Sequence, residues 1–251
     1  MRILRWVLLP AALVGIWWVV SGRGQNFYLP TPSAVWHAFG RVWTPAALRA
    51  DVVPSVVRLL VGFAVAGLIG VGAGLAIGLS PALRAYTEPV LEFLRAIPPP
   101  VLVPVVMLFA GIDNTMKITV IVFGCVWPVL LNTVEGVRGV DTVLAEVCTA
   151  YRITGWRRMR TLVLHGASPQ IMTGLRQSLA IAIILMVISE MFAASSGLGF
   201  SIVQFQRSFA IPEMWTGIIL LGLLGVGLAV LFGLVERLIL GWYFGLRRAT
   251  R

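Results

Sequence analysis

The chain has 251 residues, of which 59% are hydrophobic and 12% charged, and its mean hydropathy is +0.93. Soluble domains are about half apolar and about a quarter charged, so this balance excludes an ordinary soluble protein and predicts an integral membrane protein. The net charge of +10 does not indicate nucleic-acid binding, because the arginines lie at the ends of apolar segments, where lipid headgroups and membrane orientation explain them.

No polar stretch is long enough for a separate soluble domain, so residues 1–251 are expected to form a single transmembrane domain of the all-α class. The first apolar segment, residues 6–20, follows a short basic start. A cleaved signal peptide is one interpretation of it, but Val19-Val20-Ser21-Gly22 is a poor small-x-small cleavage site. Because several apolar segments follow, we predict that residues 6–20 form the first transmembrane helix. Residues 33–43 suit an amphipathic helix in the membrane interface.

The second predicted span, residues 55–79, has a ridge of small residues on one helix face. They recur at every fourth position, as Gly62, Ala66, Gly70, Gly74 and Gly78. Such a ridge lets another helix approach closely, and van der Waals packing is a main driving force for helix association in lipid. Glycine is common in membrane spans in general, but five small residues in one register favour close packing. Residues 84–95 have a second amphipathic pattern.

The third predicted span, residues 98–110, is short and begins with three consecutive prolines. At 1.5 Å per residue it covers only about 20 Å of a hydrocarbon core that is roughly 30 Å thick. Short, proline-rich spans are typical of helices that line a cavity. Three further spans complete the predicted set: residues 116–134, with a kink expected at Pro128, residues 172–194 and residues 214–235. Residues 195–213 are predicted to be a loop.

Residues 138–170, between the fourth and fifth spans, hold the densest positive cluster of the chain. The arginines are Arg138, Arg152, Arg157, Arg158 and Arg160. An apolar stripe from Leu144 to Ile153 predicts one short helix, residues 156–164 predict a second, and Pro169 is expected to end it and to start the fifth span. Two short helices with basic flanks predict a docking surface for another protein, whereas an ordinary basic loop needs no such pattern.

The orientation in the membrane follows from the arginines that lie outside the span edges. Six spans place both chain ends on one side of the membrane. Twelve of these arginines lie on the side of the termini and of residues 138–170, against four on the other side. Since cytoplasmic loops carry the excess of positive charge, both termini and the 138–170 loop are predicted to be cytoplasmic.

Several motifs together resemble the permeases of bacterial ABC importers, and most closely the branch that serves nitrate, aliphatic sulfonates, taurine and bicarbonate. In the loop, Glu146-Val147-Cys148 takes the place of the family's Glu-Ala-Ala stretch. The other similar motifs are Trp156, Pro169 and Gly174; Ser55, Arg58 and Gly62-Phe63; Arg95-Ala96-Ile97-Pro98 with Pro104; Asn132-Thr133 with Gly136; and Glu190 with Gly197-Leu198-Gly199. Two positions depart from the family: Arg152 stands where Gly is usual, and His165 stands where Pro is usual.

The resemblance covers most of the chain and implies a type I ABC importer permease fold with six transmembrane helices in the bacterial cytoplasmic membrane. It also implies a permease homodimer in the lipid bilayer, bound to two cytoplasmic ATPase subunits and served by an extracytoplasmic solute-binding protein. The chain itself has no Walker A motif, no HExxH and no Gly-x-Ser-x-Gly. We therefore expect it not to be an enzyme and to hold no cofactor or metal, with ATP and Mg bound by the partner ATPase.

The resemblance assigns a coupling role to the cytoplasmic loop, because in this family the short helix of the loop sits in a groove of the ATPase. The residues concerned are Glu146, Val147, Cys148, Arg152, Gly155, Arg157 and Arg158. A carboxylate at Glu146 can hydrogen-bond the turn after the helix or pair with basic groups of the ATPase. The arginines can contact the ATPase or lipid phosphates, and both interpretations stay open.

Glu190 lies inside the apolar run of the fifth span, where a charge is costly and marks a candidate for function. We expect that Glu190 holds the extracellular gate or its loop by pairing with Arg58 or Lys117. A position near the outer headgroups, or a purely structural pairing with the same partners, explains this residue equally well.

Candidates for the translocation path are polar or aromatic residues on the third to fifth spans: Met107, Phe109, Trp127, Asn132 and Gln177. Packing roles explain most of them as well. Cationic groups near the spans, such as Arg58, Lys117 and Arg176, are compatible with a small anion, and a thiamine pyrimidine or an aromatic acid is the alternative solute. A stand-alone secondary transporter is expected to carry more intramembrane carboxylates and inverted repeats, and a non-transporting scaffold would not need the patterned loop.

Overall fold

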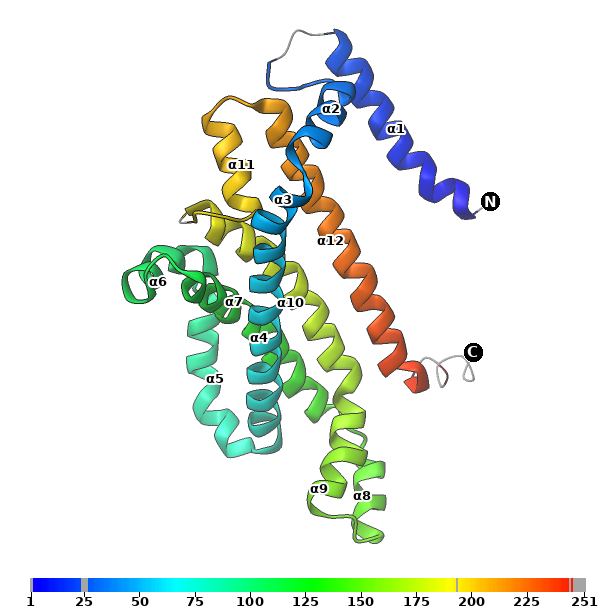
Figure 1. Ribbon diagram of the computed structural model, residues 1–251. Helices are drawn as coiled ribbons and strands as arrows, with labels where there is room; N and C mark the ends of the chain where they lie inside the picture. Colours follow the sequence, from blue (N-terminus) through cyan, green and yellow to red (C-terminus); the bar gives the residue numbers. More distant parts are fainter. Residues whose placement is uncertain (1, 24–26, 193, 244, 246–251) are drawn as a thin grey trace. The chain divides into compact units, whose positions relative to one another are not determined.

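The computed structural model describes residues 2–23, 27–192, 194–243 and 245, and Figure 1 shows their helices. The elements are α1 (Arg2–Arg23), α2 (Pro32–Val42), α3 (Pro45–Ala47), η1 (Leu48–Val52), α4 (Val53–Leu79), α5 (Pro81–Ala96), η2 (Pro99–Val101), α6 (Leu102–Ala110), α7 (Asn114–Arg138), α8 (Thr142–Ala150), α9 (Gly155–Arg158), η3 (Met159–Leu164), α10 (His165–Phe192), α11 (Leu198–Arg207) and α12 (Ile211–Ile239). Within the described ranges every regular element is a helix, which confirms the predicted all-α class.

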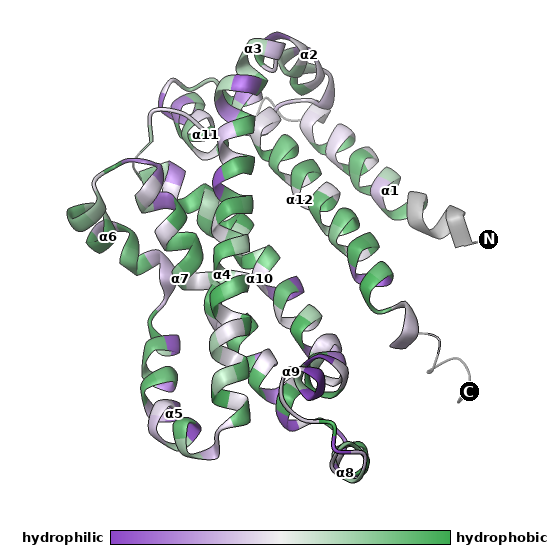
Figure 2. Ribbon diagram, turned by 60° about the horizontal axis from the view of Figure 1, so that its bottom comes forward, coloured by the Kyte–Doolittle hydropathy of each residue, from purple (hydrophilic) through white to green (hydrophobic). Residues whose placement is uncertain are grey.

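Four helical stretches of the described chain are long and apolar enough to cross a membrane. They are Pro45–Leu79, Asn114–Arg138, Gly155–Phe192 and Ile211–Ile239, which contain the predicted second, fourth and sixth spans and the predicted fifth span as far as Phe192. Helix α5 and the helix Pro99–Ala110 pass the same test only as a pair, bent by 72°. The apolar part of α1, Leu8–Gly22, is shorter than the roughly 20 residues that a span needs, so the count of six is not fully reached. Figure 2 shows α4 and α12 hydrophobic along most of their length.

The chain divides into two compact units, each built from segments that are distant in the sequence. The first unit consists of Met1–Val56 and Glu190–Leu224, and the second of Val57–Ser189 and Gly225–Arg251. The Glu190 side chain therefore belongs to the first unit, and the 138–170 loop belongs to the second.

Tryptophan side chains link α1 and the α2 region to the start of α12 within the first unit. The rings of Trp17 and Trp215 stack with their centroids 5.8 Å apart, and Trp17 Nε1 donates a hydrogen bond to the Pro30 carbonyl at 3.0 Å. Trp43 is buried and donates from Nε1 to Thr216 Oγ1 at 2.9 Å. Buried indoles with a partner for the N–H are the usual way in which tryptophan stabilises a core.

The two predicted amphipathic helices form where the sequence indicates, as α2 and α5. Thr31 caps α2 by accepting a hydrogen bond from the Ala34 N–H at 3.3 Å, and Ser80 caps α5 by accepting one from the Leu83 N–H at 3.2 Å. A proline follows each cap, at the first helical position, where its missing N–H costs nothing.

In the second unit, α4 packs against α7 along the predicted ridge of small residues. A Cβ atom added at Gly70 would lie 2.7 Å from Val129 Cβ, and one added at Gly74 would lie 2.5 Å from Thr133 Cβ. Both Val129 and Thr133 are fully buried. The glycines therefore let the two backbones approach more closely than any side chain would allow, which confirms the predicted packing role of the ridge.

The prediction that Pro169 separates the second loop helix from the fifth span is wrong, because the helix is continuous from Gly155 to Phe192. Pro169 lies inside α10 and has no N–H to donate to the carbonyl of His165, four residues earlier. The hydroxyl of Ser168 donates to that carbonyl instead, at 2.8 Å. A local substitute donor thus keeps the helix intact where the proline would end it.

The prediction of a loop at residues 195–213 is also wrong, because its middle forms α11 and α12 begins earlier, at Ile211. Two glycines, Gly197 and Gly199, lie near the start of this stretch. Only Gly197 has a positive φ, of +130°, and it lies directly before α11. Leu198 and Ser201 are buried, so one face of this short helix packs into the first unit.

Candidate functional site

The 138–170 loop forms a helix pair with defined ends. Asp141 caps α8 by accepting a hydrogen bond at Oδ1 from the Val143 N–H at 2.7 Å. At the other end the Arg152 N–H donates to the Thr149 carbonyl at 3.0 Å, and the Ile153 N–H donates to the Cys148 carbonyl at 2.8 Å. These two bonds are the Schellman arrangement, which requires a left-handed residue just after the helix.

Arg152 is that left-handed residue, with φ +52°. Glycine usually occupies this position, because other residues are strained there. The nearest glycine, Gly155, also has a positive φ, of +58°, and it begins α9. The departure from the family pattern at Arg152 therefore leaves the turn in place but puts a strained residue in it.

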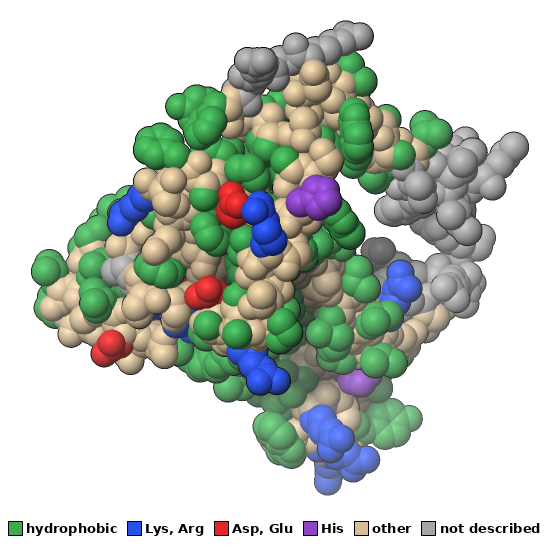
Figure 3. Space-filling model, turned by 45° about the horizontal axis from the view of Figure 1, so that its top comes forward, with side chains coloured by type: hydrophobic (Ala, Val, Ile, Leu, Met, Phe, Trp, Pro, Cys, Tyr) green, Lys and Arg blue, Asp and Glu red, His purple; other side chains and the backbone are tan. Residues whose placement is uncertain are grey.

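The helix pair exposes most of its predicted apolar stripe. Leu144, Val147 and Tyr151 of this stripe are exposed, up to 77% at Tyr151, whereas Cys148 is buried; Val143 and Trp156, outside the stripe, are exposed as well. Glu146 and Arg158 line a hollow of about 450 Å³ between α8 and α9. In Figure 3, basic side chains gather at the lower end of the view, with hydrophobic side chains beside them. An exposed patch of apolar side chains with charged residues around its edge is typical of a surface that binds another protein.

Glu190 is the centre of a second cluster, in the first unit. Its side chain is 1% exposed, and the Ser55 hydroxyl lies 2.7 and 2.8 Å from its two carboxylate oxygens. The Gly199 N–H donates to Oε2 at 3.0 Å. Ser55 also accepts a hydrogen bond from the Leu198 N–H at 2.9 Å, and Asp51 Oδ1 accepts one from the Gly197 N–H at 3.0 Å. The carboxylate and its neighbours therefore fix the turn that leads into α11.

The turn leaves no room for a side chain at Gly197. A Cβ atom added there would lie 2.5 Å from Glu190 Oε2. Sequence reasoning selected Glu190 but missed Asp51 and Ser55 as the residues that act with it on this turn. The signal was the Gly197-Leu198-Gly199 motif, which supplies backbone N–H groups without side chains in the way.

The two cations proposed as partners of Glu190 are buried as well. Arg58 is 6% exposed and donates from Nε to Asn114 Oδ1 at 2.7 Å. Lys117 is 4% exposed and donates to the Ile112 carbonyl at 3.1 Å. Their pairing with Glu190 stays a prediction.

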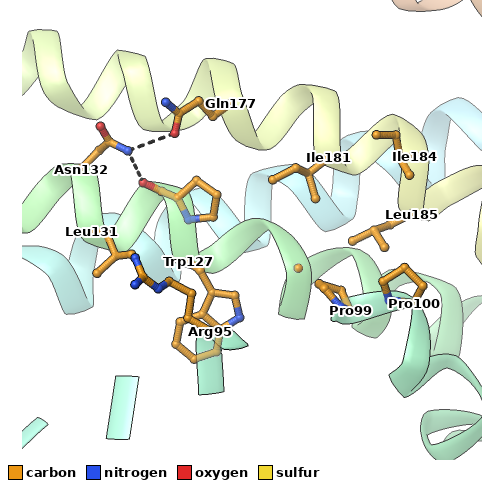
Figure 4. Close-up of a pocket in the computed structure, with 12 residues that line it drawn as sticks. Arg95, Pro99, Pro100, Trp127, Leu131, Asn132, Gln177, Ile181, Ile184 and Leu185 are labelled. Atoms are coloured by element: carbon orange, nitrogen blue, oxygen red, sulfur yellow. Dashed lines mark hydrogen bonds between the residues drawn. The ribbon is translucent and has the colours of Figure 1, made fainter. Parts of the chain in front are cut away.

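A cavity of about 600 Å³ opens between α7, α10 and the proline-rich η2 in the second unit (Figure 4). It is lined by Arg95, Pro99, Pro100, Gly124, Trp127, Pro128, Leu131, Asn132, Gln177, Ile181, Ile184 and Leu185. Three of the predicted path residues, Trp127, Asn132 and Gln177, therefore come together here. Met107 and Phe109 are not among the lining residues, and Phe109 is 88% exposed.

The polar side chains of this cavity are the amides of Asn132 and Gln177, the indole of Trp127 and the guanidinium of Arg95. Asn132 Nδ2 donates to the Pro128 carbonyl at 2.8 Å and to Gln177 Oε1 at 3.3 Å. The indole Nε1 of Trp127 is buried and has no hydrogen-bond partner. Arg95, at the end of α5, forms an ion pair with Glu92. Arg176, which the sequence also suggested, pairs with Glu236 and does not line this cavity.

Among the described residues, no group of three or more His, Cys, Asp or Glu side chains could hold a metal ion. A membrane transport permease is the class of protein that these features indicate. They are the span-length helices, the α8–α9 pair and the cavity beside α7 and α10. The chain belongs to the family described as binding-protein-dependent transport system inner membrane component, whose model matches residues 52–241.

Named relatives of this chain are also transport permeases. The chain is 32% identical to the putative aliphatic sulfonates transport permease protein SsuC of Bacillus subtilis, over 94% of this chain and 86% of the relative. It is 28% identical to the taurine transport system permease protein TauC of Escherichia coli, over 93% and 87%. It is 27% identical to the nitrate import permease protein NrtB of Synechocystis, over 95% and 90%.

The fold agrees as well. A chain of the MetNI methionine ABC transporter in an inward-facing conformation superposes with a TM-score of 0.67, covering 76% of this chain and 95% of that one, at 18% sequence identity. The predicted branch of nitrate, sulfonate and taurine permeases is thereby confirmed, and the protein is a multi-pass component of the inner membrane.

Proposed function

We propose that this chain is the permease subunit of an ATP-driven importer that moves a small anionic solute across the cytoplasmic membrane by alternating access. The functional unit is a permease homodimer with two cytoplasmic ATPase subunits and an extracytoplasmic solute-binding protein. ATP and Mg bind the ATPase, this chain holds no cofactor, and both chain termini lie in the cytoplasm.

The observation that carries this proposal is the exposed apolar face of the α8–α9 pair. Leu144, Val147 and Tyr151 are exposed on the loop that joins two span-length helices. Without a partner, these apolar side chains are in contact with water. Covering such a face with a partner is favourable, at about 25 cal/mol for each Å² of apolar surface buried. Because η3 and α10 continue from α9 as one helix, a push on the pair is transmitted directly into the span.

The anionic class of the solute is supported by two independent observations. Relatives are named for aliphatic sulfonates, taurine and nitrate, all of which carry an anionic oxygen group. The lining of the cavity includes Arg95 and no Asp or Glu. A site of this kind favours hydrogen-bond acceptors and negative charge.

The experiment that tests the proposal compares the solubilised wild type with the double variant Glu146→Ala plus Arg157→Ala. Each is tested for binding of the cognate ATPase and for stimulated ATP hydrolysis. We expect the double variant to insert normally and to lose both. The matched control is Arg84→Ala plus Glu88→Ala on α5, which removes the same charges elsewhere and should leave both unchanged. A wild type that binds no ATPase would overturn the proposal.

A further inference from the structure

We propose that a groove between α10 and α12 binds one phospholipid of the leaflet nearer the 138–170 loop, with an acyl chain along the groove and the phosphate at Arg176. The groove shares no lining residue with the cavity beside α7, and the lipid site goes beyond the importer function proposed above.

The groove measures about 440 Å³ and is apolar along its length. Its walls are Leu179, Ala180 and Ile183 of α10 and Gly225, Ala229 and Phe232 of α12. Arg176 is the one polar side chain among the lining residues that the structure describes. An ordered water needs two to four polar partners, so this groove holds water poorly. An acyl chain fills it without breaking any hydrogen bond.

Small side chains on the two helices leave this space open. A Cβ atom added at Gly225 would lie 3.7 Å from Ile183 Cδ1, which is an ordinary contact distance. On the ridge of α4, in contrast, a Cβ added at Gly74 would clash with Thr133, because those two helices pack directly. The small residues of the groove therefore do not serve close helix packing, and room remains for a chain between the helices.

The mouth of the groove belongs to the helix that the protein covers least. No residue of the most apolar 18-residue stretch of α12 is buried, although the stretch is long and apolar enough to cross a membrane. Such a surface is stable only against hydrocarbon, so acyl chains of the bilayer surround α12. A chain that enters the groove leaves one apolar environment for another and gains contacts with both helices.

An ion pair across the two helices provides the polar end of the site. Arg176 on α10 pairs with Glu236 on α12, and their side chains are 61% and 14% exposed. A guanidinium has five N–H groups, and one carboxylate does not use all of them. The mostly covered carboxylate therefore holds the guanidinium in place, and the exposed side of the guanidinium can donate to a phosphate, which arginine binds through charge-assisted hydrogen bonds.

The level of this pair along the helices is that of a lipid headgroup. Arg176 lies four residues inside the predicted start of the fifth span, and Glu236 directly follows the predicted end of the sixth. Six residues beyond Glu236, the ring of Trp242 packs against His165 with centroids 4.8 Å apart, and tryptophan is enriched at the membrane interface. From Arg176 the groove runs about 10 Å along α10 to Ile183, toward the middle of the bilayer.

The test is photolabelling of the purified, delipidated permease in dodecyl maltoside, a detergent without phosphate. The probe is a phosphatidylethanolamine with a diazirine in the middle of one acyl chain, and labelled peptides are mapped by mass spectrometry. We expect saturable labelling of residues 179–183 and 225–232. Unlabelled phosphatidylethanolamine should compete, and a diacylglycerol with the same chains, which lacks the phosphate, should compete about tenfold less.

Two variants separate the chain from the phosphate. Ala229→Leu fills the groove with a side chain and should lower labelling about tenfold, whereas Gly227→Leu on the same helix, where nothing lies within 4 Å of an added Cβ, should label like the wild type. Arg176→Gln with Glu236→Gln removes both charges without leaving a carboxylate unpaired. In this double variant the two competitors should become equally effective.

Labelling that rises in proportion to the probe without saturating would show surrounding lipid only and would overturn the proposal. Wild-type labelling in Ala229→Leu, or equal competition by the two lipids in the wild type, would overturn it as well. Absence of groove labelling in the wild type would show that another part of the assembly, such as a second permease copy, covers the groove. ATPase binding and uptake are measured on the same proteins, so failure of the lipid site leaves the importer function standing.

Discussion

The backbone N–H of Gly199 donates to carboxylate oxygen Oε2 of Glu190 at 3.0 Å, and the two residues lie nine positions apart in the sequence. The carboxylate is buried, so the turn and the end of α10 are held together by a group that water does not reach. We infer that this contact, with Ser55 beside it, keeps α11 docked during transport.

Replacement of Glu190 tests that inference. Glu190→Ala leaves the Gly199 N–H without its acceptor, at a cost of about 1–3 kcal/mol, whereas the Ser55 hydroxyl still donates to the Asp51 carbonyl at 2.9 Å. We expect a clear drop in the thermal midpoint of the solubilised protein and a loss of uptake. Glu190→Gln keeps one acceptor oxygen, so its thermal midpoint and its uptake should lie between those of the wild type and those of Glu190→Ala. Wild-type uptake and expression in both variants would contradict a holding role for Glu190.

Gly197→Ala tests the same turn from the backbone side. The position has φ +130°, and the new Cβ would meet the Glu190 carboxylate, so we expect a loss of about 1–3 kcal/mol in the free energy of unfolding. The control is Gly222→Ala on α12, where nothing lies within 4 Å of the new Cβ. That change should be neutral or slightly stabilising, since alanine is the better helix former. Equal effects of the two variants would show that the turn tolerates a side chain.

The glycine ridge of α4 gives a prediction with an internal control two residues away. Gly74→Ala would place a Cβ 2.5 Å from Thr133 Cβ, whereas Gly72→Ala meets nothing within 4 Å. We expect Gly74→Ala to destabilise the protein by about 1–3 kcal/mol through overpacking, and Gly72→Ala to have little effect. Thermal unfolding of the two variants in the same detergent measures the difference, and a Gly74→Ala midpoint at or above that of Gly72→Ala would refute close packing of α4 on α7.

Arg152→Gly is expected to stabilise the turn between α8 and α9. Arg152 has φ +52°, and a non-glycine residue in this region costs about 1–2 kcal/mol, of which the greater chain entropy of glycine offsets part. Hydrogen exchange at the Ile153 N–H, which closes the Schellman arrangement, should slow about two- to fivefold. Arg157→Gly, within regular helix, should instead speed exchange in α9. Faster exchange at Ile153 in Arg152→Gly would show that the arginine side chain stabilises the turn.

A variant that breaks the helix α8 tests whether this helix is needed for coupling to ATP hydrolysis and not for insertion of the protein in the membrane. Val147→Pro removes the N–H of a mid-helix residue and costs about 3 kcal/mol, enough to disrupt a nine-residue helix. We expect normal insertion in the membrane but no stimulation of ATP hydrolysis by the permease. Thr142→Pro, at the first helical position where proline is favoured, is the control and should remain coupled. Full coupling in Val147→Pro would show that α8 is not needed as a helix.

Much of the fold could be predicted from the sequence because the relevant signals are local. Apolar runs of span length mark α4, α7, α10 and α12, since a helix in lipid must satisfy its own backbone hydrogen bonds within one segment. The ridge of small residues on α4 could also be predicted from the sequence, because a period of four residues is a property of a single helix. The error at Pro169 was also local, because the proline was treated as a helix breaker without regard to the Ser168 hydroxyl beside it.

The candidate sites needed the tertiary structure. Ser55 is 135 residues from Glu190, and Asp51 is 146 residues from Gly197, so no sequence window contains either pair. The cavity likewise depends on which faces of α7 and α10 meet, and only that meeting joins Trp127 and Gln177 and leaves out Phe109. The sequence by itself determined the class of protein and the four long apolar helical stretches, because burial in lipid acts on each segment separately. The tertiary structure decided which side chains share a site, because that depends on packing between segments that the chain keeps far apart.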